Sequence, residues 1–224
     1  MTVPRIADMR VLELFPTPLW SVDIDAAAAT ALNDRLGREI ETILSPRPAL
    51  PRGGSWQTDP VLHRHPGFAD LAGLIERSAV GALKFLALKS PRAAITGMWA
   101  NVNPRGGQAS SHTHPNNFLS AVYYVKVPPG EGVIQFTDPR PAAEVMLPPI
   151  AEENRFNGNR RIFEVRPGRL LLFPAWLRHD VPPNRAEEER VSIAANLMLE
   201  DYVERASAPL WSGSAKVDPA SLKR

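Results

Sequence analysis

The sequence predicts a mainly β protein with flanking helices, in which the helices pack on an antiparallel double-sheet core. Apolar residues recur every three or four positions within the first ninety residues, as they do along one face of a helix. From Ala93 onward they alternate with polar residues instead, and short turn motifs such as PPGEG, NGN and RPG separate the alternating stretches. Several short strands divided by such turns are typical of a sandwich or a barrel.

Two helices are expected before residue 92. The first spans residues 23–44 and has an aspartate that can cap it, and the second spans residues 67–90 and stops before Pro91. The segment between them, 45–60, is dense in proline and glycine and is interpreted as an ordered loop. The apolar positions are Leu32, Leu36, Ile40 and Ile43 in the first helix and Leu71, Leu74, Ile75, Leu83 and Leu86 in the second.

Six segments are predicted to be the strands of the core. They cover residues 94–103, 118–127, 132–136, 161–165, 169–173 and 190–199. The length fits a single domain, 1–224, with a helical part at about 1–92, a β core at about 93–200 and a tail at 201–224. The end of this tail is rich in serine, alanine and lysine, so we expect it to be loose.

The composition is that of an ordinary globular protein, with 44% hydrophobic and 22% charged residues. The chain contains no cysteine, which excludes disulfides, thiolate metal sites and a cysteine nucleophile. No apolar run is long enough to span a membrane, and the first residues do not resemble a secretory signal. The basic residues are scattered along the chain, so neither nucleic acid nor a membrane is expected as a partner. We therefore expect a cytoplasmic protein.

Two of the five histidines, His112 and His114, stand one residue apart just before a predicted strand. In an extended chain alternate side chains point to the same side, so the two imidazoles would share one face. A third, His179, follows another predicted strand and begins a proline-rich loop. Three converging histidines suggest a metal site, although paired histidines alone are also common surface residues. A second H-x-H, His63 and His65, lies in a proline-flanked loop and is interpreted as a solvated or helix-capping segment.

The strand predicted at 190–199 has two different faces. One face is wholly apolar and is expected to lie on the hydrophobic core. The other carries Arg190, Ser192 and Asn196 among small residues, which suits the lining of a polar pocket. A guanidinium fork with a hydroxyl two residues further on can hold a carboxylate. Taken alone, however, an arginine after an acidic run is more often a solvated cation at a strand edge.

The order and spacing of these motifs resemble the iron(II)/2-oxoglutarate oxygenases of the jelly-roll superfamily. The segments HTHPNNFLSAVYYVKVPPGEGVIQFTDPR and PGRLLLFPAWLRHDVPPNRAEEERVSIAAN look like a bacterial family of 2-oxoglutarate oxygenases. The stretches LFPTPLW and GGSWQTDPVL extend the similarity over nearly the whole chain. The resemblance implies a double-stranded β-helix (jelly roll) core with the N-terminal helices packed on it.

The same resemblance implies roles for individual residues. His112 and His179 would hold Fe(II), and Arg190, assisted by Ser192, would pair with the distal carboxylate of the cosubstrate 2-oxoglutarate. The implied protein is a 2-oxoglutarate-dependent dioxygenase. It would decarboxylate 2-oxoglutarate to succinate and hydroxylate an unactivated C–H bond.

The sequence departs from the superfamily pattern at position 114, where the usual second ligand is an Asp or a Glu. We favour His114 as the third iron ligand because the alternation places it beside His112. A distant carboxylate such as Asp138 is the alternative, or water or halide in its place. Asp180 is available by position but points away from His179 in an extended chain.

Further residues complete the expected site. Tyr123 or Tyr124 would add a phenol to the 2-oxoglutarate carboxylate, and Tyr124 is taken as the candidate. Trp99, Asn101 and Asn103 share one face of their predicted strand and are candidates to line the substrate pocket, although a buried structural role is as plausible. The substrate is expected to be a small molecule or a peptide. The oligomeric state stays open, with a homodimer as one option.

Two other classes of function remain. A cupin-like three-histidine metalloenzyme that needs no cosubstrate would leave Arg190 and Ser192 without a role. A non-catalytic jelly-roll binding protein would share the fold but would not explain three converging histidines.

Overall fold

The computed structural model describes residue 5 and residues 7–140, 145, 148–205 and 213–222. Within these residues the strands form two antiparallel sheets, one of six strands in the order β1-β8-β5-β10-β3-β2 and one of four in the order β4-β9-β6-β7. The strands are β1 (Trp20–Asp23), β2 (Trp56–Gln57), β3 (Ala93–Asn103), β4 (Ala109–His112), β5 (Leu119–Lys126), β6 (Val133–Thr137), β7 (Arg160–Glu164), β8 (Arg169–Pro174), β9 (His179–Val181) and β10 (Arg190–Leu199).

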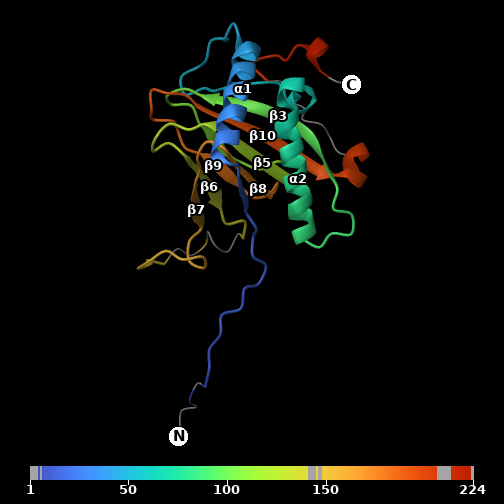
Figure 1. Ribbon diagram of the computed structural model, residues 1–224. Coiled ribbons are helices and arrows are strands. Elements are labelled where there is room, and N and C mark those ends of the chain that lie inside the picture. The colour runs from blue at the N-terminus through green and yellow to red at the C-terminus, as the bar shows by residue number, and fades with distance from the viewer. Residues whose placement is uncertain (1–4, 6, 141–144, 146–147, 206–212, 223–224) are drawn as a thin grey trace.

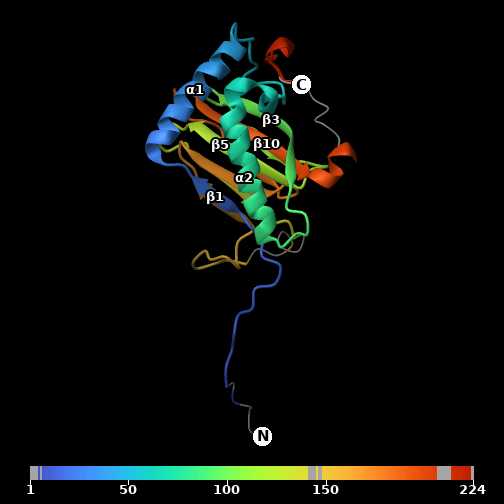
Figure 2. The same ribbon diagram turned by 45° about the vertical axis from the view of Figure 1, so that its right-hand side comes forward.

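Two long helices, α1 (Ala26–Leu44) and α2 (Ala69–Phe85), cover one face of the six-stranded sheet (Figure 1). Turned by 45°, the molecule shows both helices lying over β3, β5 and β10 (Figure 2). The larger hydrophobic cluster fills this layer, with Leu36 and Ile40 of α1, Leu71 and Ile75 of α2 and Ile193 of β10 all fully buried. Burial of such side chains contributes roughly 1.5–3 kcal/mol each, which fixes the sheet beneath the helices.

A second, smaller hydrophobic cluster lies on the opposite face of the large sheet. It joins Tyr124 of β5 and Phe173 of β8 to Ile134 and Phe136 of β6, so the two sheets pack against each other. The prediction of a mainly β, jelly-roll core with N-terminal helices packed on it is therefore confirmed.

The two faces of β10 are divided as the alternation predicts. Its apolar face belongs to the cluster beneath the helices, and its polar face is turned to the space between the sheets. Both central neighbours bind along its length, β3 on one side and β5 on the other. The polar side chains of β10 therefore stand at the centre of the large sheet.

Helix α2 ends at Phe85, five residues before the predicted end. Ala87 adopts a positive φ of 53°, and the amides of Leu88 and Ala87 donate to the carbonyls of Leu83 and Lys84. This closes the helix in the manner of a Schellman motif. Glycine normally occupies the left-handed position of that motif, so an alanine there leaves no signal in the sequence.

Four short strands and the end of the chain differ from the prediction. Strands β1, β2, β4 and β9 have two to four residues each, too few for an alternation to be recognised. The expectation of a loose tail is wrong for residues 213–222: Ala215 and Val217 are buried, Ala215 pairs with Thr58, and Gly213 donates to Asp59. The rest of the expected tail from 206 to 212 lies outside the described residues. No helix among the described residues is both long and apolar enough to cross a membrane.

Candidate metal and cosubstrate site

Three histidines meet where strands β4 and β9 of the small sheet pair. His112 ends β4 and His179 begins β9, and the antiparallel register pairs these two residues directly, with ring centroids 4.4 Å apart. The ring of His114 lies 4.9 Å from that of His112 and 5.2 Å from that of His179. One nitrogen of each ring lies within 4.8 Å of the others, so a single metal ion can bind all three.

A backbone hydrogen bond holds His114 in this group. The residue lies two positions past the end of β4. Its backbone amide donates to the carbonyl of Ala175, in the turn between β8 and β9, over 2.9 Å. The amide of Ala175 in turn donates to the carbonyl of Phe118. The loop after β4 is thereby fastened beside the strand that carries His179.

Two of the imidazoles have their orientation fixed by backbone carbonyls. Nδ1 of His112 lies 2.6 Å from the carbonyl oxygen of Ser110, and Nδ1 of His179 lies 2.8 Å from that of Leu177. A carbonyl oxygen only accepts, so each Nδ1 carries the proton and donates it. The Nε2 lone pair of both rings is therefore available to a metal, an arrangement that is usual for metal-binding histidines.

Burial keeps two of the three rings neutral. Desolvation, with a smaller contribution from His112 and His179, lowers the pKa of His114 from 6.5 to about 3. Desolvation also lowers the pKa of His179, to about 4, against the opposing effect of its bond to Leu177. Because a metal must displace any proton on its ligand, neutral rings at pH 7 are ready to bind.

The same shifts predict how stability depends on pH in the metal-free protein. In the unfolded chain both histidines take up protons near pH 6.5, whereas the folded protein keeps them neutral down to about pH 4. The unfolded state then binds more protons, so the free energy of unfolding should fall as the pH is lowered through this window. Urea titrations at several pH values measure the decline. His114→Gln removes one of the two groups and should flatten it; an identical decline would contradict the assignment.

Arg190, the first residue of β10, is a buried cation that forms no salt bridge with any described residue. Its side chain is 2% exposed, and its guanidinium donates to the carbonyls of Glu131 and Pro182 over 3.1 and 2.9 Å. None of the ion pairs between described residues involves it. Desolvation lowers its pKa, which reflects the cost of a charge held away from water. Such a group suits a carboxylate brought by a ligand.

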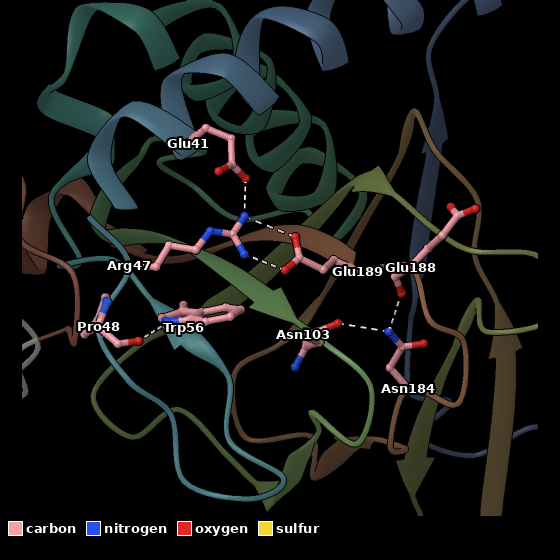
Figure 3. A network of polar contacts seen from close by, with 8 residues as sticks. All are labelled: Glu41, Arg47, Pro48, Trp56, Asn103, Asn184, Glu188 and Glu189. Atoms are coloured by element: carbon pink, nitrogen blue, oxygen red, sulfur yellow. Dashed lines mark hydrogen bonds and ion pairs between the residues drawn. The ribbon is translucent and has the colours of Figure 1, made fainter. Parts of the chain in front are cut away.

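A network of polar contacts holds the segment that leads into β10 (Figure 3). Arg47 lies 4.7 Å from the ring centre of Trp56 and binds both Glu189 and Glu41 through its guanidinium. Asn184 donates to the carbonyls of Asn103 and Glu188 and so ties the same segment to β3. Glu189 immediately precedes Arg190, so the network fixes the backbone from which the buried cation projects. Sequence reasoning missed this network because its two long-range contacts, Arg47 with Glu189 and Asn184 with Asn103, join residues 142 and 81 positions apart.

The two adjacent tyrosines lie on opposite faces of β5. The hydroxyl of Tyr123 donates to Asn33 of α1, on the helical side. Tyr124 faces the interior between the sheets and stands directly opposite Ser192 in the register of β5 and β10. Its buried hydroxyl has no hydrogen-bond partner, and burial raises the pKa of this phenol. The structure therefore places Tyr124, not Tyr123, on the same side as Ser192.

The predicted substrate residues lie on β3, on the same side of the sheet as these groups. The ring of Trp99 lies 5.8 Å from that of His114. The side-chain amides of the other two residues are bound by the segment that contains β2. Asn101 accepts from Gln57 over 2.7 Å, and Asn103 donates to Ser55 over 2.6 Å. Trp99 is thus the member of the three that contacts the histidines, and a substrate role for all three stays a prediction.

The other candidates are not brought to this group. Asp138 is held by Arg140, which binds its carboxylate and lowers its pKa. His65 caps a short 3-10 turn through a bond from Gly67, as the helix-capping interpretation predicts. Among the described residues, the metal-binding group consists of three histidines and no carboxylate, so neither Asp138 nor Asp180 belongs to it.

Comparison with protein families agrees with this geometry. A family model described as "Putative 2OG-Fe(II) oxygenase" matches residues 97–196. This segment contains the three histidines, Tyr124 and Arg190. A search of curated proteins found no significant relative.

Solved structures show the same fold at low sequence identity. The α-ketoglutarate-dependent epimerase SnoN from nogalamycin biosynthesis matches with a TM-score of 0.57 and 15% identity over 92% of both chains. A prolyl-4-hydroxylase from Pseudomonas putida matches with a TM-score of 0.54 and 17% identity, over 82% of this chain and 94% of that one. AviO1 from Streptomyces viridochromogenes Tue57 matches with a TM-score of 0.59 and 13% identity, over 86% and 93%.

The family match covers the paired strands β4 and β9, whose ends bring the histidines together, and the solved structures share the fold that holds these strands. Through residues 97–196 the chain is similar to the 2OG-Fe(II) oxygenases, oxidoreductases that use Fe(II) and 2-oxoglutarate.

Proposed function

We propose that this protein is an Fe(II)- and 2-oxoglutarate-dependent dioxygenase that hydroxylates an unactivated C–H bond of a small molecule or a peptide. The observation that carries the proposal is the combination of a three-histidine group with a buried arginine that forms no salt bridge with any described residue. A cupin-like metalloenzyme without cosubstrate would leave that arginine unexplained. A binding protein without catalysis would leave the histidine group unexplained.

The residues present fit both cofactors. Neutral imidazoles suit Fe(II), and the three residues offer one nitrogen each, which leaves other coordination positions for cosubstrate and dioxygen. The buried guanidinium of Arg190 and the unbonded hydroxyl of Tyr124 are the donors that a carboxylate needs. We assign His112, His114 and His179 to the metal and Arg190, Tyr124 and Ser192 to 2-oxoglutarate.

When bound, the cofactors would supply the oxidation with dioxygen as the oxidant: one oxygen atom would enter succinate, formed from 2-oxoglutarate with loss of carbon dioxide, and the other would enter the hydroxylated substrate. The chain provides the positioning. Backbone carbonyls bind Nδ1 of the two strand histidines and leave their Nε2 free for the metal, and the network around Arg47 keeps Arg190 in place. The aromatic side chains of Phe136 and Phe173 border His179 and exclude water from that side.

Oxidation of 2-oxoglutarate tests the proposal without knowledge of the substrate. Protein is loaded anaerobically with Fe(II), mixed with 2-oxoglutarate and then exposed to air. It should form succinate slowly, through turnover that is not coupled to oxidation of a substrate. The control is His179→Ala treated identically. Succinate formation no higher than in this control would contradict the proposal. Once a substrate is found, a mass gain of one oxygen atom distinguishes hydroxylation from desaturation or from the epimerase and carbocyclase reactions named for structural neighbours.

Tyr124→Phe should separate a role in cosubstrate binding from a role in folding. The lost hydroxyl has no partner in the protein, so the free energy of unfolding should stay the same or rise, by up to about 1 kcal/mol. The Kd for 2-oxoglutarate should rise by about tenfold or more, because a hydrogen bond to a charged group contributes about 1.5–3 kcal/mol. Urea unfolding and calorimetric titration give the two values. An unchanged Kd would remove Tyr124 from the site.

The location and assembly of the protein stay predictions. We propose a cytoplasmic enzyme, and a homodimer is one assembly to test by size-exclusion chromatography with light scattering.

A further inference from the structure

The third histidine is held differently from the other two. Nδ1 of His112 and of His179 each donates to a backbone carbonyl two residues earlier in the chain. Nδ1 of His114 instead lies 3.3 Å from the side-chain nitrogen Nδ2 of Asn196, on β10. A carbonyl can only accept, whereas an amide side chain presents either a donor or an acceptor. The protonation pattern of His114 therefore depends on which end of Asn196 faces it.

Asn196 is built firmly into the sheet. Its side chain is 5% exposed, and the buried hydroxyl of Ser120, on the neighbouring strand, donates to its Oδ1 over 3.0 Å. The register between β10 and β3 shifts immediately after Asn196, where Thr96 of β3 is passed over in the pairing. The hydroxyl of Thr96 bonds to the side-chain oxygen of Asn117 over 2.6 Å and lies 3.2 Å from the backbone carbonyl oxygen of Asn196.

The two orientations of the amide have opposite consequences. If the NH₂ group faces His114, it donates to Nδ1, so a neutral ring carries its proton on Nε2 and cannot offer that nitrogen to a metal. If the oxygen faces His114, it accepts a proton from Nδ1, and Nε2 is free, as in His112 and His179. Ser120 satisfies either orientation, because its hydroxyl both donates and accepts.

We propose that Asn196 is the positioning residue that sets the tautomer of His114. With its oxygen toward the ring, Asn196 holds the proton on Nδ1 and turns the Nε2 lone pair into the three-histidine group. With its amide nitrogen toward the ring, it closes that ligand position. Metal binding then selects the first orientation. The hydroxyl of Ser120, which can donate or accept, bonds to whichever end of the amide faces away from His114. The inference rests on the proposed function only in taking His114 as a ligand.

Two substitutions distinguish positioning from a merely structural role. Asn196→Asp supplies only acceptors, so His114 should carry its proton on Nδ1 permanently. Asn196→Leu supplies neither donor nor acceptor and leaves the ring unoriented. Thr96→Val is the control, because it removes the hydroxyl that bonds to Asn117 and to the backbone carbonyl of Asn196 without touching the Asn196 amide.

The first measurement is the tautomer itself, read from ¹⁵N chemical shifts of the histidine rings in metal-free protein above pH 7. We expect the Nδ1–H form of His114 in Asn196→Asp and a mixture of tautomers in Asn196→Leu. The Thr96→Val spectrum should match that of the unmodified protein. The same tautomer population in all four proteins would overturn the inference, whether or not the protein is an oxygenase.

The second measurement is the affinity for Co(II), followed by its visible spectrum. Loss of an outer hydrogen-bond partner typically weakens metal binding by about 10–100-fold, and Asn196→Leu should show a loss of this size. Asn196→Asp and Thr96→Val should bind at least as tightly as the unmodified protein. A Kd for Asn196→Leu within twofold of the unmodified value would overturn the inference. Loss of Co(II) binding in His179→Ala with no effect in His114→Ala would place the error in the ligand assignment.

Discussion

Replacing His179 with alanine should abolish both iron binding and turnover of 2-oxoglutarate. His179 is 5% exposed, and its Nε2 faces the other two histidines because Nδ1 is bound to the carbonyl of Leu177. Removing a ligand should cost more than the roughly 10–100-fold loss of metal affinity caused by removing an outer hydrogen-bond partner. Iron per chain after anaerobic loading measures the first effect, and succinate formation measures the second.

The same outcome is expected for His112→Ala and His114→Ala, while circular dichroism shows that each variant stays folded. His65→Ala is the matched control, because His65 caps a 3-10 turn and does not belong to the metal-binding group. His114→Asp should keep iron, since a carboxylate restores the ligand that the superfamily normally has at this position. Full iron occupancy in His114→Ala would show that the third ligand lies elsewhere.

Replacing Arg190 with alanine should weaken 2-oxoglutarate binding while leaving iron binding nearly intact. The guanidinium is buried and bonded only to carbonyls among the described residues, so a ligand carboxylate would be its ionic partner. Loss of one partner of a buried charged pair costs about 2–5 kcal/mol, or tens- to thousands-fold in affinity. Calorimetric titration of the metal-loaded protein under anaerobic conditions gives this Kd.

Arg190→Lys should rescue binding only partly, because an ammonium cannot reproduce the planar fork of the guanidinium. Arg47→Met tests the supporting network separately. It leaves Arg190 present but frees the preceding Glu189, so its effect on the Kd should be smaller than that of Arg190→Ala. A Kd for Arg190→Ala equal to that of the unmodified protein would exclude the arginine from the cosubstrate site.

The long elements could be predicted from the sequence because each buries one face. The alternation in β10 separates Arg190 and Ser192 from Val191 and Ile193. All four are buried in the structure, and only the apolar pair joins the hydrophobic cluster beneath the helices. The short elements could not be predicted. Strand β4 has four residues and β9 has three, and they become strands only because they pair with each other beside β6.

The sequence predicted which histidines form the candidate site, but not the contacts that hold them there. The three histidines do meet, and the backbone bond from His114 to Ala175 that holds the third one could not be predicted from the sequence. Asn196 was visible as a polar residue on the correct face of its strand, yet nothing in the sequence shows that it contacts His114. Contacts between residues 82 positions apart become evident only once the register of the sheet is known.

A crystal structure with Mn(II) and an unreactive 2-oxoglutarate analogue, grown without oxygen, tests the central claim most directly. Anomalous scattering locates the metal independently of the protein phases. The account predicts one ion bound by Nε2 of His112, His114 and His179, with the distal carboxylate of the analogue on Arg190. A metal bound by Asp138 in place of His114, or an analogue whose carboxylate lies away from Arg190, would contradict it.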